Sequence, residues 1–255
     1  MLENSLANKP NMTNKKKIAH VISITAWVFF AFVATQIGML AILQAAKELG
    51  FRVQAGDQVL SMLLLNAVIY TLALIITVGA PRFARLLPKD LSIKKLLGID
   101  KKPTLSDFGM AVMAYIAYLV ISAVVMLVII QVIPGFQADQ KQELGFESLA
   151  SGFEYIFAFL ALVVMAPLAE ELLFRGYLFG RLRSYISFIP ATIITSALFG
   201  LVHGQWNVGI DVFILSIALC YLREKTQSLW PAIFLHATKN GIAFMLLFVF
   251  PTPFV

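Results

Sequence analysis

The sequence has little charge and almost no cysteine. Of its 255 residues, 13% are Asp, Glu, Lys or Arg and one is cysteine, Cys220, whereas 60% are hydrophobic. The single cysteine excludes an intrachain disulfide and a zinc site built from several cysteines. The low charge excludes a soluble domain, because such domains carry about 25% charged residues. The composition therefore indicates a membrane protein.

Long apolar runs fill most of the chain. A helix needs about 20 apolar residues to cross the hydrocarbon layer, and by this measure the sequence contains seven candidate spans. They are residues 20–43, 58–80, 107–133, 153–180, 188–206, 208–222 and 229–250. The predicted fold class is all-α: a polytopic membrane protein of about seven transmembrane helices, with a helical bundle in the C-terminal half.

The net charge of +6 does not indicate nucleic-acid binding, because the basic residues follow a topological pattern. They gather before the first span and after the second, fourth and sixth, whereas the loops after the first and third spans are mainly acidic. Lys and Arg mark cytoplasmic loops. We therefore expect a multi-pass protein of the cell membrane, with a cytoplasmic N-terminus, an extracytoplasmic C-terminus and no nucleic-acid partner.

Three charged residues interrupt the fourth apolar run, in the stretch APLAEELLFRGYLFGRL. A charge near the bilayer centre costs at least ~2.5–3.5 kcal/mol on insertion scales, so each must be paired, hydrated or used in chemistry. Glu171 and Arg175 are spaced i,i+4 and are expected to pair. Glu170 points ~100° away around the same helix and is left to face another partner. Pro167 is expected to kink this helix, which would free backbone carbonyls beside Glu170.

Two later spans carry further polar residues. Phe199 and His203 share one face in FGLVH, and His236 and Asn240 share one face in HATKN. A lone histidine in a membrane helix is usually a packing residue. Two histidines, a spare glutamate and an asparagine on three spans instead indicate convergence, because ionisable groups at this depth face the bundle interior or a wet cavity.

Such a cluster suits peptide-bond hydrolysis. A carboxylate in a partly hydrated pocket can act as a general base toward water, one histidine can position that water, and a second histidine with an amide can stabilise an oxyanion. No Ser, Thr or Cys stands beside a base as a covalent nucleophile, so direct attack by water is the simpler mechanism.

The motifs EELLFRG, FGLVH and HATKN resemble the EExxxR, FxxxH and HxxxN patterns of the CAAX prenyl protease and bacteriocin-processing family, also called Abi or CPBP. The resemblance covers about residues 150–245, and every motif position is filled. It implies an intramembrane endopeptidase. Its catalytic set would be Glu170 with His203 as the water-activating pair and His236 with Asn240 as the oxyanion site.

The resemblance also implies a supporting set, formed by Glu171, Arg175 and Phe199. Together, the predicted spans and the resemblance divide the chain into a cytoplasmic tail (1–19), three N-terminal helices with a basic inner loop (20–145) and a catalytic core (146–250). The expected partners are the lipid bilayer and a peptide or protein substrate, presented at the cytoplasmic side because span seven would place His236 within ~10 Å of that surface.

The family has been described both as metal-dependent and as metal-free. The absence of HExxH favours a mechanism without a cofactor, and zinc is the alternative if a glutamate and two histidines meet at one ion. Two other functions stay open. One is a non-catalytic membrane scaffold or bacteriocin-immunity protein of the same fold; the other is a proton-coupled transporter. Nothing in the sequence identifies the substrate.

Overall fold

The computed structural model describes residues 12–50, 58–87, 91–138, 140, 146, 149 and 151–250. Within these residues every regular element is helical, as predicted. In chain order the elements are α2 (Asn14–Glu48), α3 (Gln58–Leu74), η2 (Ile75–Gly79), α4 (Ala80–Phe83), α5 (Ile93–Leu97), α6 (Leu105–Val132), α7 (Gly152–Phe159), η3 (Leu160–Met165), α8 (Ala166–Glu171), η4 (Leu172–Phe179), α9 (Gly180–Arg183), α10 (Phe188–Leu201), α11 (Trp206–Thr226), α12 (Trp230–Phe244) and η5 (Met245–Val249).

Several of these elements join end to end into long apolar helices. Within the described residues six helices are long and apolar enough to cross a membrane, and they match six of the seven predicted spans. The fifth predicted span is shorter than expected: α10 has 14 residues, or about 21 Å at ~1.5 Å per residue. His203 therefore lies in the turn after α10, and not on the helix as the sequence suggested.

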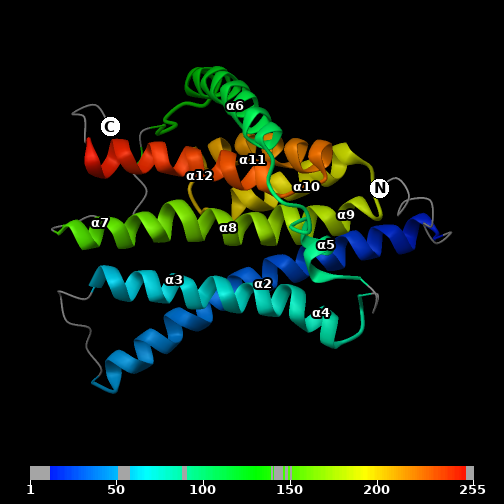
Figure 1. Cartoon of the computed structure of the whole chain (residues 1–255), viewed down its shortest axis with the longest axis horizontal. Helices are drawn as coiled ribbons and strands as arrows, with labels where there is room; N and C mark the ends of the chain where they lie inside the picture. Colours follow the sequence, from blue (N-terminus) through cyan, green and yellow to red (C-terminus); the bar gives the residue numbers. More distant parts are fainter. Residues whose placement is uncertain are drawn as a thin grey trace.

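One composite helix, Gly152–Arg183, runs through the middle of the bundle (Figure 1). Its two π-helical segments, η3 and η4, flank α8, the short segment that ends with both glutamates. Side chains of η4 such as Leu173, Phe174 and Leu178 are fully buried and form the main core with Phe199 of α10. The polar motif is thus carried on a central helix whose η4 segment is almost wholly buried.

The other helices surround this central one. In Figure 1, α2 and α3 lie on one side of it, while α10, α11 and α12 lie on the other. The α6 helix is peripheral and packs on α11 and α12. Most of its large apolar side chains, Leu127 among them, face outward, as expected for a lipid-facing helix.

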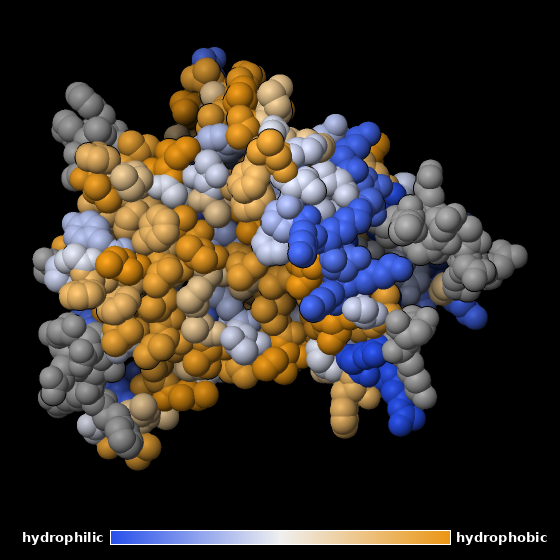
Figure 2. Space-filling model, in the orientation of Figure 1, coloured by the Kyte–Doolittle hydropathy of each residue, from blue (hydrophilic) through white to orange (hydrophobic). Residues whose placement is uncertain are grey.

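The basic loops meet at one end of the bundle. The short helix α5 ends at Gly98, whose φ of 75° is left-handed, a conformation that glycine adopts without a steric cost. The Gly98 carbonyl accepts a 2.8 Å hydrogen bond from the Leu229 N–H, and the Lys101 carbonyl accepts one from the Trp230 indole at 2.7 Å. These two bonds hold the loop between the second and third spans, which contains α5, beside the start of α12. Figure 2 shows a hydrophilic surface at this end, next to the hydrophobic belt.

Candidate active site

The predicted ion pair on the central helix is present and fully buried. Arg175 donates to Glu171 Oε1 across 2.8 Å, and both side chains have 0% exposure. The guanidinium carbon also lies 4.2 Å from the centre of the Phe199 ring, within the range of a cation–π contact. The expectation that Glu171 and Arg175 pair is therefore confirmed.

His236 is attached to the same carboxylate. Its Nδ1 lies 2.8 Å from Glu171 Oε1, and because a carboxylate only accepts, Nδ1 carries the hydrogen of this bond. The other ring nitrogen, Nε2, lies 3.7 Å from Glu170 Oε2. Glu171 thus orients both Arg175 and His236 and directs Nε2 toward the second glutamate.

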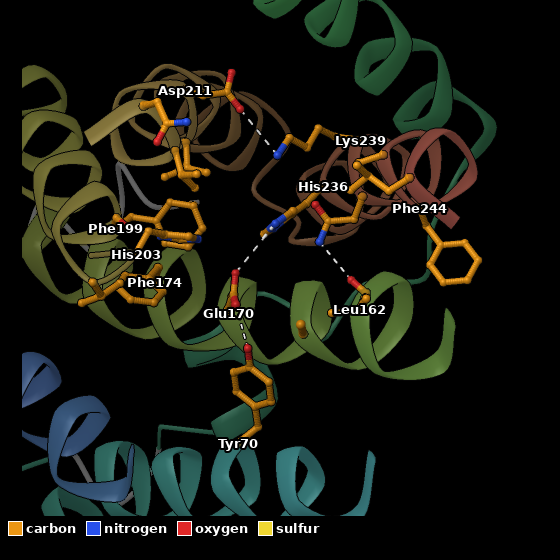
Figure 3. Close-up of a pocket in the computed structure, with 18 of the residues that line it drawn as sticks. Tyr70, Leu162, Glu170, Phe174, Phe199, His203, Asp211, His236, Lys239 and Phe244 are labelled. Atoms are coloured by element: carbon orange, nitrogen blue, oxygen red, sulfur yellow. Dashed lines mark hydrogen bonds and ion pairs between the residues drawn. The ribbon is translucent and has the colours of Figure 1, made fainter. Parts of the chain in front are cut away.

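Glu170 faces away from the ion pair, as predicted, and has a partner that the sequence did not indicate. The Tyr70 hydroxyl, on α3, donates to Glu170 Oε1 across 2.8 Å, and Figure 3 shows the two groups pointing toward each other. A tyrosine within an apolar run carries no motif. The hydroxyl of Tyr70 was the available signal, but Thr71 and Thr77 carry hydroxyls in the same apolar run, and none of them reveals which helix it faces.

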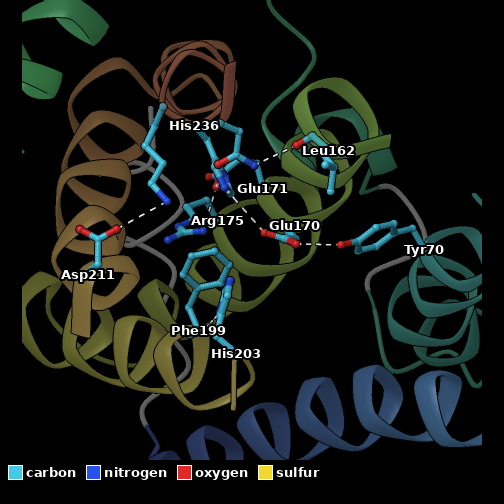
Figure 4. Close-up of polar contacts among 11 residues, drawn as sticks. Tyr70, Leu162, Glu170, Glu171, Arg175, Phe199, His203, Asp211 and His236 are labelled. Carbon is cyan, nitrogen blue, oxygen red and sulfur yellow. Dashed lines mark hydrogen bonds and ion pairs between the residues drawn. The ribbon is translucent and has the colours of Figure 1, made fainter. Parts of the chain in front are cut away.

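His203 is held by the residue that begins its motif. Its Nδ1 lies 2.7 Å from the Phe199 carbonyl oxygen, so Nδ1 carries the hydrogen and Nε2 is left as an acceptor. The Phe199 ring stands edge-on to both histidines, at centroid distances of 4.8 Å to His203 and 5.9 Å to His236. Phe199 is thus the common wall of the site, as Figure 4 shows.

Asn240 has a partner that the sequence did not indicate. Its Nδ2 donates to the Leu162 carbonyl across 2.9 Å, so at least one amide hydrogen is used within the protein. It still lines the same cavity as Glu170, His203 and His236. All four predicted catalytic residues therefore converge, although they come from three separate segments: α8, the turn after α10, and α12.

The cavity has a volume of about 750 Å³. An ion pair outside the motifs crosses its wall: Lys239 Nζ lies 3.5 Å from Asp211 Oδ2, while Asp211 Oδ1 accepts hydrogen bonds from Tyr118 at 2.6 Å and Ser122 at 2.7 Å. These bonds attach the peripheral helix α6 to α11. The motifs did not indicate this group, because Lys239 fills an unspecified position of HxxxN and Asp211 lies outside all three motifs.

The cavity extends away from the basic end of the bundle. Its lining includes Gln36, Ala138, Leu162, Asn207, Leu247 and Phe248. Each belongs to the half of its helix, or to a connection, that lies opposite α5 and the start of α12. This part of the lining does not support the cytoplasmic mouth expected from the depth of His236, which stays an untested prediction.

The sequence favoured a reaction without a metal and kept zinc as the alternative. Within the described residues no three His, Cys, Asp or Glu side chains are arranged to hold a metal ion. His236 Nδ1 bonds to Glu171, and His203 Nδ1 bonds to the Phe199 carbonyl. Such bonds are also usual behind metal-binding histidines, so the metal-free reaction stays a prediction.

The helical bundle, its two glutamates and the two histidines define the class: a multi-pass membrane protein with a cluster of ionisable residues among its helices. Residues 152–242 match the family model described as "Type II CAAX prenyl endopeptidase Rce1-like". This segment is similar to that family, and the resemblance predicted from the three motifs is confirmed there.

Two curated proteins are also similar to the chain. One is "Putative membrane peptidase YdiL" of Bacillus subtilis (strain 168), 30% identical over 77 residues, which are 30% of this chain and 32% of that protein. The other is "UPF0177 protein YxdF" of Lactococcus lactis subsp. lactis (strain IL1403), 34% identical over 79 residues, which are 30% of this chain and 42% of that protein. The matches thus span less than half the length of these relatives. No solved structure matches the chain.

Proposed function

We propose that this protein is an intramembrane endopeptidase that hydrolyses a peptide bond by direct attack of water. The observation that carries the proposal is the convergence of Glu170, His203, His236 and Asn240 on one cavity between apolar helices. The similarity of residues 152–242 to CAAX prenyl endopeptidases supports it. Three polar motifs would not need to meet in a cavity if they served only to hold helices together.

In the proposed mechanism Glu170 is the general base. Its Oε1 is held by the Tyr70 hydroxyl, which leaves Oε2, on the side of His236, to take a proton from water. His203 Nε2 is an acceptor, because Nδ1 donates to the Phe199 carbonyl. The water would be oriented by two acceptors, one of which removes its proton as the oxygen attacks the scissile carbonyl.

The opposite wall serves the developing oxyanion and the leaving amine. His236, with Nδ1 fixed on Glu171, would present Nε2 to the reacting groups once that nitrogen is protonated, and Asn240 would donate an amide hydrogen. Glu170 would pass its proton to the leaving nitrogen, so no net proton is gained. The Glu171–Arg175 pair acts behind the site by orienting His236.

The proposal does not involve a metal, and it places the substrate outside the cytoplasm. The cavity extends toward the end opposite the basic loops, and basic loops mark the cytoplasmic side. We therefore revise the cytoplasmic expectation: a peptide or membrane-protein segment would reach the site from the extracytoplasmic side. The N-terminus would face the cytoplasm and the C-terminus the outside.

Comparative analysis of membranes tests the proposed function. Native membranes containing wild type, Glu170→Gln or Glu48→Gln would be compared by mass spectrometry of protein N-termini. Glu48 is the matched control, because its carboxylate is exposed and binds only Gln44 among the contacts seen. We expect new N-termini with wild type and Glu48→Gln and none with Glu170→Gln. Identical termini in all three samples would instead favour a non-catalytic scaffold.

A further inference from the structure

The turn before Pro167 leaves one backbone carbonyl without a backbone donor. In a helix, the Leu162 carbonyl would be reached by the N–H of residue 166 in an α turn or of residue 167 in a π turn. Ala166 donates instead to the Ala161 carbonyl, and Pro167 has no N–H. The free carbonyl is the acceptor that Asn240 Nδ2 uses at 2.9 Å.

This bond fixes the orientation of the Asn240 amide. A side-chain amide has two N–H groups in one plane, so a hydrogen bond from the first determines where the second points. Asn240 lines the cavity together with His236, one helical turn away on α12. An amide without this anchor would rotate about its terminal torsion, which is broad and roughly two-fold.

We propose that Pro167 is a positioning residue for the reaction. By withholding an N–H, it keeps the Leu162 carbonyl free to hold Asn240, whose second N–H then faces the oxygen of the scissile carbonyl. The inference rests on the proposed endopeptidase function and extends it to a residue outside the three motifs. It also explains why a proline stands three residues before Glu170 in the central helix.

The protein offers a matched control, because a π turn precedes a second proline. Ala80 donates to the Ile75 carbonyl and Pro81 lacks an N–H, so the carbonyl equivalent to that of Leu162 is Ile76. The next carbonyl, that of Thr77, accepts from the Trp27 indole at 3.2 Å. This second turn, with its proline and its side-chain donor from a neighbouring helix, contributes no residue to the cavity lining. Replacing Pro81 makes the same backbone change away from the site.

The proposal can be tested by steady-state kinetics of a double-mutant cycle that combines Pro167→Ala with Asn240→Ala. The control variant is Pro81→Ala. Alanine at 167 restores an N–H that competes with Asn240 for Leu162. We expect kcat to fall about 10-fold or more, a fraction of the ~10²–10³-fold cost of losing an oxyanion donor, with KM within about twofold. Pro81→Ala should leave kcat unchanged. In the Asn240→Ala background, Pro167→Ala should have no further effect on kcat.

Two kinetic outcomes would overturn the inference: an unchanged kcat in Pro167→Ala, or the same fold-loss with and without Asn240.

Thermal unfolding gives a second double-mutant cycle that needs no substrate. Asn240→Ala should lower the Tm of wild type more than that of Pro167→Ala, because Leu162 then has a backbone donor. Additive Tm changes would refute the coupling. An inactive wild type with a coupled Tm cycle would refute the endopeptidase function and with it the catalytic role, but not the Pro167–Asn240 coupling.

Discussion

Tyr70 donates its hydroxyl hydrogen to Glu170 across 2.8 Å and thereby joins the two halves of the chain at the candidate base. The residues that carry the family resemblance all lie after residue 150, whereas Tyr70 belongs to α3. The N-terminal helices therefore contribute to the site directly.

Tyr70→Phe tests this contribution. The change removes one oxygen, so packing on α3 should be retained, while the Glu170 carboxylate loses its fixed donor. We expect kcat to fall about 10-fold, within the ~1.5–3 kcal/mol typical of hydrogen bonds to charged groups, with little change in Tm. Tyr221→Phe, at an exposed tyrosine on α11, is the matched control. If both variants cleave at the wild-type rate, Tyr70 has no part in the reaction.

Glu170→Gln should abolish cleavage while the protein stays folded. The two side chains are nearly isosteric, and loss of a general base typically costs ~10²–10⁴-fold in rate. Because an amide has its own hydrogen-bond acceptor, the Tyr70 contact is preserved. The measurement is single-turnover cleavage of a substrate found in the membrane comparison, with Tm as the folding control. A rate within a few-fold of wild type would disprove the role of Glu170.

The Glu171–Arg175 pair should respond differently to single and double changes. Arg175→Met strands a buried carboxylate, at a cost of ~3–5 kcal/mol in the free energy of unfolding. The double variant Glu171→Leu/Arg175→Met removes both charges and should recover much of the Tm, because apolar side chains can replace a buried pair. It should stay inactive, since His236 loses its acceptor. A fully active double variant would show that Glu171 does not orient His236.

Chelation tests the proposed metal-free reaction. The purified wild type, treated with EDTA or 1,10-phenanthroline and then desalted, should cleave at the rate of untreated enzyme. The physical reason is that Glu170 and His203 can orient and deprotonate a water by themselves, and no three metal-ligand side chains of the described residues are arranged around one ion. Loss of activity on chelation, restored by added zinc, would establish metal dependence.

Cysteine labelling tests the orientation of the chain. In a Cys220→Ser background, single cysteines would be placed at Leu49 and at Lys95, exposed positions at opposite ends of the bundle. A membrane-impermeant thiol reagent should label position 49 from outside intact cells and position 95 only in inverted vesicles. The reverse pattern would overturn the topology.

A third cysteine, at Leu247, tests the mouth of the cavity. It should react from outside, and a bulky reagent there should block cleavage. Labelling of position 247 only in inverted vesicles would restore the cytoplasmic mouth that the sequence suggested.

The sequence by itself determined the helical class, the approximate spans and the pairing within one helix. Apolar runs of span length leave the backbone no alternative to helix in lipid, and side chains spaced i,i+4 on one helix are neighbours whatever surrounds them. For these reasons six spans and the Glu171–Arg175 pair could be predicted. The convergence of the motifs was inferred from the cost of burying charge. That cost predicts that each charged side chain has a partner, but it does not identify the partner.

Tertiary structure alone decided which partners those are. Tyr70 reaches Glu170, Asn240 reaches Leu162 and Lys239 reaches Asp211 only because particular helices lie side by side, and an apolar helix in lipid shows little periodicity from which its facing side can be read. The short α10, which places His203 in a turn, likewise depends on packing against α11. Local spacing fixes contacts within a helix, whereas contacts between helices are set by the packing of the whole bundle.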